Sequence, residues 1–333
     1  MTEQLAVSPG MPMDDGGEAV LDVEKLSILH GQNGQGAVPI VSDVSFRLRQ
    51  GETLGLVGES GSGKSLTALG LIGLLPMGLR GTGRIDLLGR DLVGLSERQL
   101  ESVRGAQISM VFQDPMTGLN PVRTVGSTLA EAARRHRRCS RAEARELVID
   151  GLAAVGIPSP RERFSAYPHQ LSGGLRQRVM IALALINSPS VILADEPTTA
   201  LDTTVQAQIM RLLQEKTRQA ALVLITHDLG VAAELSDRIA VMYSGRIVEQ
   251  APVAGLLTAP RHPYTMALLA AAPTFDRSRR LVSIPGLPPS PFDRPTGCPF
   301  HPRCPRALPT CAVQRPPLTE HAGAHLACWN PHD

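Results

Sequence analysis

The chain has 333 residues, of which 43% are hydrophobic and 19% are charged, and its formal net charge is +2. This length and apolar content exclude an intrinsically disordered chain and allow one large domain or two smaller ones. The near-neutral balance does not indicate nucleic acid as a partner, and we expect none. The one basic run, residues 134–138, is interpreted as a solvated helix face or loop; a nucleic-acid or lipid-headgroup patch is the alternative.

No segment has the roughly 18 unbroken apolar residues that a membrane-spanning helix requires. The best candidate, residues 66–79, is interrupted by three glycines and a proline. Residues 1–17 carry acids and prolines and lack the basic start and apolar middle of a signal peptide, so we interpret residues 1–20 as a flexible tail. If the protein works at a membrane, we expect it to do so from the cytoplasm and through other subunits.

Apolar runs of strand length alternate with helix-like periods, which predicts an α/β architecture. The predicted strands, in chain order, are residues 53–57, 108–112, 191–194 and 222–226. Their uninterrupted apolar character suits a mainly parallel sheet that is covered on both faces. A glycine-rich turn follows the first strand, and a helix is predicted to start near Gly63. Residues 239–243 and 247–250 flank Ser244-Gly245, which predicts a hairpin.

The segment from about residue 94 to 174 has mostly helical periodicity. Leu147, Val148, Leu152 and Val155 form one apolar stripe at helical spacing, which indicates a buried helix face and not a cofactor site. After about residue 252 the prolines multiply, and four of the five cysteines follow. Residues 256–333 are therefore predicted to form an appended module with little regular structure.

Residues 58–65 fit the pattern G-x-x-x-x-G-K-[ST] between a predicted strand and a predicted helix. Backbone N–H groups of such a loop surround phosphate oxygens, and the helix adds the positive end of its dipole. Lys64 is expected to hold the β- and γ-phosphates of ATP, and the Ser65 hydroxyl to ligate Mg²⁺. The predicted nucleotide-binding residues of this loop are Gly58, Glu59, Ser60, Gly61, Ser62, Gly63, Lys64 and Ser65.

Two carboxylates, Asp195 and Glu196, end the predicted strand 191–194. Asp195 can support Mg²⁺ directly or through water, and Glu196 can orient and polarise an attacking water molecule. Two acids before Pro197 could also serve as a helix cap, but their combination with the phosphate loop favours ATP hydrolysis.

Residues 171–178, Leu-Ser-Gly-Gly-Leu-Arg-Gln-Arg, resemble the signature motif of ABC ATPases. In the family's order, Gln113 resembles the Q-loop glutamine, residues 200–202 the D-loop and His227 the switch histidine. The resemblance implies a P-loop NTPase of the ABC nucleotide-binding type at residues 21–255. Its RecA-like core would carry the helical subdomain at about 94–174 and be followed by the cysteine-containing extension.

The same resemblance implies a head-to-tail dimer that binds ATP between the phosphate loop of one subunit and Ser172, Gly173 and Gly174 of the other. It implies that the catalytic residues are Glu196, His227 and Gln113, and that the Mg²⁺ site comprises Ser65, Gln113 and Asp195. The implied partners are two transmembrane permease subunits, a second ATPase subunit and, indirectly, an extracytoplasmic peptide-binding protein. The expected location is peripheral, on the cytoplasmic face of the inner membrane.

One feature departs from the family's pattern. The family usually stacks adenine on an aromatic residue that precedes the phosphate loop, and no Tyr, Trp or Phe occupies that region here. His30 is the nearest candidate, although an imidazole stacks more weakly than an indole or a phenol.

Four cysteines of the C-terminal segment, Cys298, Cys304, Cys311 and Cys328, are spaced C-x5-C-x6-C-x16-C. A cytoplasmic ATPase has little use for disulfides, so four thiolates in a proline-rich module suggest a metal centre. A 4Fe-4S cluster takes four cysteines at wide spacing, whereas the C-x2-C pairs of zinc sites are absent. Zinc with His301 or His325 as a further ligand, or no metal at all, stays open.

Residues 261–265 and 298–305 resemble the C-terminal extension of dipeptide and oligopeptide importer ATPases. The resemblance implies an iron–sulfur cluster in the extension and predicts an ATP-hydrolysing subunit that powers uptake of di- or oligopeptides. A nickel or oligosaccharide importer is the alternative, because related cassettes share nearly all core motifs. A non-transport ABC ATPase is disfavoured, because neither a second cassette nor a long coiled coil is present.

Overall fold

The computed structural model describes residues 18–31, 36–114, 118–198, 203–272, 283–321 and 323–332. Most of the predicted tail and the predicted D-loop at 200–202 lie outside these ranges. The chain divides into two compact units. The first unit contains residues 1–47, 53–93 and 225–333, and the second contains residues 48–52 and 94–224.

The first unit contains an antiparallel sheet in the order β2-β1-β4-β5. Its strands are β1 (Ala19–His30), β2 (Val38–Arg49), β4 (Leu79–Leu87) and β5 (Arg90–Asp91). Buried and exposed side chains largely alternate along β1 and β2, as expected of a sheet with one face on a core and the other toward solvent.

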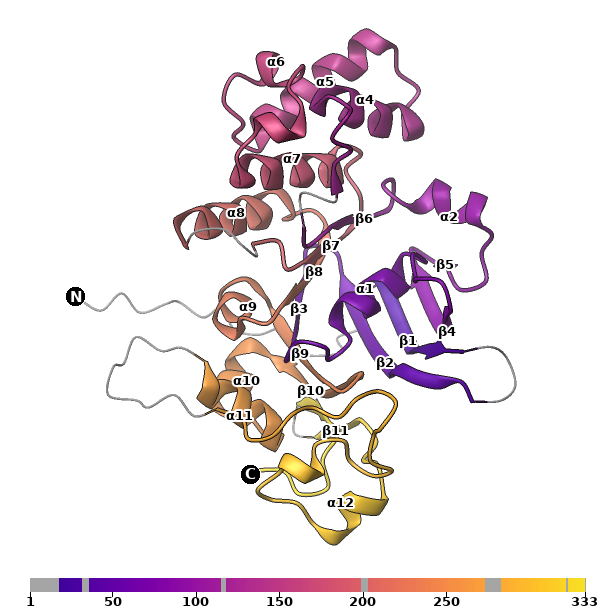
Figure 1. Cartoon of the computed structure of the whole chain (residues 1–333), viewed down its shortest axis with the longest axis vertical. Helices are drawn as coiled ribbons and strands as arrows, with labels where there is room; N and C mark the ends of the chain where they lie inside the picture. Colours follow the sequence, from indigo (N-terminus) through magenta and orange to yellow (C-terminus); the bar gives the residue numbers. More distant parts are fainter. Residues whose placement is uncertain are drawn as a thin grey trace, which may run out of the picture. The chain divides into compact units, whose positions relative to one another are not determined.

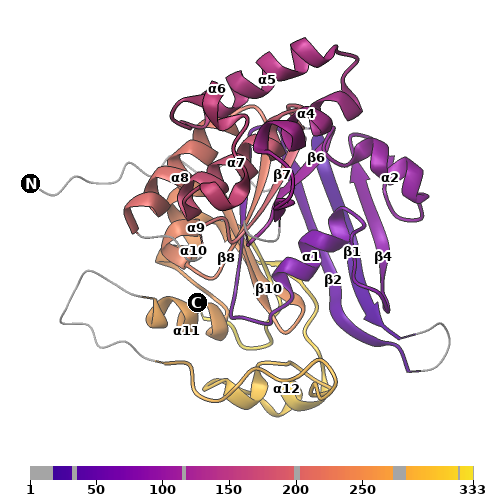
Figure 2. The same ribbon diagram turned by 45° about the horizontal axis from the view of Figure 1, so that its top comes forward.

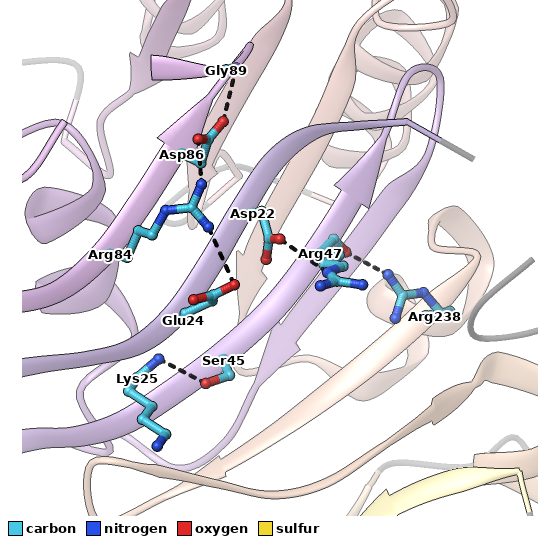
Figure 3. Close-up of polar contacts among 9 residues, drawn as sticks. All are labelled: Asp22, Glu24, Lys25, Ser45, Arg47, Arg84, Asp86, Gly89 and Arg238. Carbon is cyan, nitrogen blue, oxygen red and sulfur yellow. Dashed lines mark hydrogen bonds and ion pairs between the residues drawn. The ribbon is translucent and has the colours of Figure 1, made fainter. Parts of the chain in front are cut away.

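Charged side chains on this sheet form ion pairs, two of them between neighbouring strands and one, Arg84–Asp86, within β4 (Figure 3). Arg47 Nε lies 3.0 Å from a carboxylate oxygen of Asp22, and Arg84 contacts both Glu24 and Asp86, at 3.3 and 2.8 Å. Such exposed pairs contribute about 0–1 kcal/mol each, so they assist the register of the strands more than their stability.

A second group of strands in the first unit runs in the order β11-β12-β10-β9-β3. These strands are β3 (Thr53–Val57), β9 (Arg238–Tyr243), β10 (Arg246–Pro252), β11 (Thr319–His321) and β12 (Ala324–Leu326). β3 and β9 are parallel, and all their residues are buried. β9 and β10 form the predicted hairpin, in which Ser244 and Gly245 both have positive φ (45° and 79°), as a type I′ turn requires.

Short helices surround these strands: α1 (Lys64–Leu71), α9 (Leu229–Leu235), α10 (Val253–Thr258), α11 (Pro263–Ala271), η2 (His301–Arg303) and α12 (Pro309–Val313). α1 begins after Gly63, close to the predicted position, and Gly63 is its left-handed N-cap with φ 102°. The N-cap of α9 is Asp228, whose carboxylate accepts hydrogen bonds from the N–H groups of Gly230 and Val231.

The C-terminal segment shares its core with the strands of the first unit. β12 pairs with β10, Glu249 opposite Leu326, so the segment adds strands to this sheet (Figure 1). One hydrophobic cluster joins Val57 of β3 to Phe300 and Cys298. Most of the described residues of this segment lie outside helices and strands, and the added strands and the common core were not predicted.

The second unit holds two buried parallel strands, β6 (Ile108–Val111) and β7 (Val191–Asp195), both close to their predicted positions. Its helices are α2 (Glu97–Val103), α4 (Val125–His136), α5 (Arg141–Ala154), α6 (Pro160–Arg163), η1 (Pro168–Gln170), α7 (Gly173–Leu185) and α8 (Thr203–Lys216). The chain passes from the second unit into the first along β8 (Ala221–Thr226).

The helices α4, α5 and α7 pack on one another (Figure 2). The predicted apolar stripe lies on α5 and its C-cap: Val148, Leu152 and Val155 are buried, and Leu147 is half-buried. Among the residues that the structure describes, no helix combines the length and apolar character needed to cross a bilayer.

Candidate functional site

The predicted phosphate loop connects β3 to α1 in the first unit and follows the backbone of β9 closely. A Cβ atom at Gly58 would lie 2.1 Å from the carbonyl oxygen of Met242, so a side chain there would displace backbone. The loop is fixed to the β9–β10 hairpin because Gly245 N–H donates to the Ser62 carbonyl oxygen at 2.8 Å. These contacts explain why the turn needs glycine at its start.

Lys64 is the first residue of α1, and it is 5% exposed. Its ammonium group donates hydrogen bonds to the carbonyl oxygens of Gly58 and Glu59, at 2.8 and 3.0 Å. The positive charge is thereby held against the loop at the N-terminus of a helix that has no acidic residue in its first turn. An ammonium group and a helix dipole together favour an anion such as a phosphate.

Glu59 is held by two residues from the C-terminal part of the chain. Its backbone N–H donates to the Tyr264 hydroxyl at 2.9 Å, and its carboxylate accepts two hydrogen bonds from Arg303, at 2.8 and 3.0 Å. These partners are 205 and 244 residues away, and no local pattern in the sequence indicated them. The Glu59 side chain therefore pairs with Arg303.

In the second unit, Asp195 and Glu196 occupy the C-terminal end of β7. Asp195 is 4% exposed, and Glu196 adopts φ 43°. A non-glycine residue in this left-handed region carries backbone strain of about 1–3 kcal/mol, and such strain is concentrated at functional sites.

Gln113 lies two residues beyond β6, the parallel neighbour of β7, and its amide donates to the Glu196 carboxylate at 3.1 Å. Adjacent parallel strands end at the same edge of a sheet, which brings these two side chains together. His227, the third predicted catalytic residue, belongs to the first unit, where it is exposed directly after β8.

The signature-like segment forms the start of α7. Ser172 is the N-cap, and its hydroxyl accepts a hydrogen bond from Leu175 N–H at 3.4 Å. Ser172 and Gly173 are exposed, whereas a Cβ at Gly174 would lie 2.9 Å from a methyl group of Val205. The result is an accessible helix N-terminus of the type that binds anions.

His30 ends β1 and is exposed, as an adenine contact would need to be. The ring of Phe292, which is 65% exposed, lies edge-on to it with 5.5 Å between the ring centroids. Phe292 belongs to the C-terminal segment, 262 positions after His30, so no local pattern indicated this neighbour.

The four C-terminal cysteines line one pocket together with Phe300, His301 and Trp329, and they form no disulfide. Cys298 and Cys311 are buried, and Cys304 and Cys328 are half-buried. Burial raises the pKa values of Cys298 and Cys304, and it raises the pKa of Cys328 to about 11. Within the described ranges, no three His, Cys, Asp or Glu side chains converge closely enough to hold a single metal ion.

Residues 41–199 match the ABC transporter family, and residues 248–311 match the C-terminal region of oligopeptide/dipeptide transporters. The chain is 48% identical over 318 residues to the dipeptide transport ATP-binding protein DppD of Bacillus subtilis (strain 168). The aligned residues make up 94% of this chain and 95% of the relative. It is 50% identical over 300 residues to the oligopeptide transport ATP-binding protein OppD of Salmonella typhimurium, 89% of each chain. Among solved structures, the dimeric ATP-binding cassette MJ0796 bound to ADP and Pi matches with TM-score 0.61 and 30% identity, covering 70% of this chain and 98% of that one.

Proposed function

The chain belongs to the family of ABC transporter ATP-binding proteins, and from this premise we propose that it is the ATP-hydrolysing subunit of an importer of dipeptides or oligopeptides. The observation that carries the cargo class is the match of residues 248–311 to the C-terminal region of oligopeptide/dipeptide transporters. The relatives of nearly full length are named for transport of dipeptides or oligopeptides, which supports the same class.

In the proposed reaction, the phosphate loop binds the triphosphate of ATP. The N–H groups of residues 58–65 surround the phosphate oxygens, and Lys64 neutralises the charge of the β- and γ-phosphates. The Ser65 hydroxyl and Asp195 hold Mg²⁺, with Gln113 as a further oxygen donor. The close contacts at Gly58 support this assignment, because only a backbone without a side chain can take that path.

Glu196 is the proposed general base, which orients and polarises the attacking water. The hydrogen bond from Gln113 at 3.1 Å fixes the position of one carboxylate oxygen of this base. His227 is proposed to contact the departing γ-phosphate.

The proposed active assembly is a dimer, because the α7 N-terminus is a second anion site on the same chain. Ser172, Gly173 and Gly174 would bind the γ-phosphate of ATP held by the partner ATPase. ATP binding then closes the dimer, and loss of the γ-phosphate lets it reopen. Permease subunits would couple this cycle to transport at the cytoplasmic face of the membrane, with an extracytoplasmic binding protein supplying the peptide.

The C-terminal cysteines are proposed to hold a 4Fe-4S cluster. Their fit rests on donor type and placement: four thiols line one pocket, and thiolates are the ligands that such clusters require. The C-x2-C pairs that zinc sites usually contain are absent, whereas an iron–sulfur cluster tolerates the wider spacing of these four cysteines. The cluster would cross-link the extension, and its thiols must lose their protons to bind it.

The cluster proposal has a direct test. Anaerobically purified protein should show broad visible absorption and contain iron and sulfide, and a Cys298→Ser, Cys304→Ser double variant should lose both. Cys139→Ser is the matched control, because Cys139 belongs to the second unit and does not line the pocket. Zinc without iron in elemental analysis would reject the cluster.

Adenine is proposed to stack beside His30, with Phe292 contributing a second ring. The two rings contact each other and both are exposed, so together they offer a larger aromatic surface than an imidazole alone.

The function is tested in the transporter reconstituted with its permeases. Glu196→Gln should abolish ATP turnover and uptake of a labelled dipeptide while ATP binding is kept, and Glu234→Gln, an exposed acid of α9, is the matched control. Unchanged turnover in Glu196→Gln would reject its role as the base. Uptake of nickel or of an oligosaccharide in place of the peptide would reject the cargo class.

A further inference from the structure

Arg303 is a nearly buried cation whose donors are directed at the phosphate loop and at its own segment. Its side chain is 5% exposed, and it lies in η2, directly before Cys304. Nε donates to the carbonyl oxygen of Pro285 at 2.8 Å, and the two terminal nitrogens donate to the two carboxylate oxygens of Glu59. A two-point guanidinium–carboxylate pair fixes direction as well as distance.

The surroundings of Arg303 keep its charge and its orientation. The Tyr243 hydroxyl accepts a further hydrogen bond at 3.2 Å, and the guanidinium carbon lies 5.7 Å and 5.9 Å from the ring centroids of Tyr243 and Phe300. Hydrogen bonding to Glu59 raises the pKa of Arg303 above its ordinary value, so the group stays protonated. Loss of the Glu59 charge would leave the guanidinium of Arg303, which is 5% exposed, without its counter-charge.

Glu59 is fixed at all three of its polar groups. Arg303 binds its carboxylate, the Tyr264 hydroxyl accepts from its N–H, and its carbonyl oxygen accepts from Lys64. The first two contacts come from the C-terminal part of the chain, and the third comes from the lysine proposed to bind the phosphates. Glu59 therefore connects the extension to that lysine through a single residue.

We propose that Arg303 is a positioning residue for ATP binding, which holds Glu59 so that the phosphate loop and Lys64 are arranged for the β- and γ-phosphates before the nucleotide arrives. Tyr264 serves the same purpose through the Glu59 N–H. A loop that is ordered in advance binds its ligand more tightly, because less conformational entropy is lost on binding. This proposal rests on the assignment of residues 58–65 as the ATP phosphate site.

The test measures binding of a fluorescent ATP analogue to the full-length chain and ATP turnover by the assembled transporter. Arg303→Ala should raise the dissociation constant by about 5- to 150-fold, the usual range of a coupling between sites. Arg303→Lys should fall between wild type and Arg303→Ala, because an ammonium group makes a single-point contact in place of the fork. In turnover, KM for ATP should rise much more than kcat falls, since the carboxylates in the second unit are unchanged.

A double-mutant cycle separates positioning from a general loss of packing. Glu59→Gln keeps the shape of the side chain and removes its charge, so it should weaken binding in a similar way. Adding Arg303→Ala to Glu59→Gln should then cause little further loss, because the two residues act as a pair. Additive losses in the cycle would overturn the proposal, as would a change in dissociation constant below about twofold in Arg303→Ala.

Two further variants, Tyr264→Phe and Lys64→Ala, test the contacts of the phosphate loop without changing Arg303. If Arg303→Ala does not fold, Glu59→Gln and Tyr264→Phe carry the test, because each removes one contact to the loop and leaves η2 intact; unchanged ATP affinity in both would overturn the proposal. Lys64→Ala tests the underlying assignment. Retained ATP affinity in Lys64→Ala would reject the phosphate site itself, whereas lost affinity there with normal affinity in Arg303→Ala would reject only the positioning role.

Discussion

Replacement of Phe300 by alanine tests whether the C-terminal extension and the strands of the first unit unfold together. Phe300 is 1% exposed. Its ring lies 5.2 Å from the ring of Tyr243 in β9 and 5.3 Å from the ring of Tyr264 in α11. The same hydrophobic cluster contains Val57 of β3, so the side chain joins the extension to the strand that leads into the phosphate loop.

The expected destabilisation follows from burial and from the aromatic contacts. A fully buried Phe→Ala substitution costs about 3–5 kcal/mol, which includes the cavity that it leaves. Aromatic pairs add about 0.5–1.5 kcal/mol each beyond their area, and Phe300 has two such pairs, so the upper part of the range applies. Small domains have total stabilities of about 5–15 kcal/mol, so the loss would be a large fraction of the whole.

The assay is urea unfolding followed by far-UV circular dichroism and by ATP-analogue binding. Leu287→Ala is the matched control, because it removes a large apolar side chain that is 88% exposed in the same extension. It should change the free energy of unfolding by less than about 0.5 kcal/mol. Equal losses of stability in the two variants would contradict a shared core of the extension and the first unit. Unfolding of Phe300→Ala in two steps, with ATP binding retained after the first step, would contradict it as well.

Two other changes test the phosphate loop and a buried histidine. Gly58→Ala should abolish ATP-analogue binding while circular dichroism stays native, because the added Cβ would lie 2.1 Å from the Met242 carbonyl oxygen; normal binding would contradict the close approach. His262 is 1% exposed, and burial lowers its pKa from 6.5 to about 3, so the folded protein contains His262 in its neutral form. Above pH 6.5 the ionisation of His262 does not reduce the free energy of unfolding. As the pH falls from 6.5 toward 3, the free energy of unfolding decreases by about 1.4 kcal/mol per pH unit. His262→Asn keeps an acceptor for Tyr264 N–H and should therefore show a flatter decline of stability between pH 6.5 and 4.5; an equal decline would assign the pH dependence elsewhere.

The parts of the fold that the sequence predicts are those with a local signal. The strands at 53–57 and 191–194 consist of apolar residues in one run, and the hairpin at Ser244-Gly245 has turn residues that accept positive φ. β12 could not be found in this way. It has only three residues, and it depends on pairing with β10, more than 70 positions earlier.

The candidate site likewise contains residues that a local motif predicts and residues that only the fold brings together. The phosphate loop is one continuous motif, and its glycines and Lys64 have chemical roles that can be read from their order. Gln113 and Glu196 belong to separate motifs in the sequence, and only the parallel pairing of β6 and β7 accounts for their hydrogen bond. Arg303 escaped prediction, because an arginine among prolines has no distinctive pattern and its partner Glu59 is 244 residues away.

The hairpin β11–β12 has a consequence for solubility. It covers the side of β10 that does not face β9, and β11 is the last strand in that direction. β11 has three residues, all exposed, and includes Glu320, features that discourage pairing with another molecule. β10 is longer and five of its seven residues are buried, so a protein shortened to residue 255 would present the unpaired backbone groups of a longer strand edge, and such edges promote aggregation.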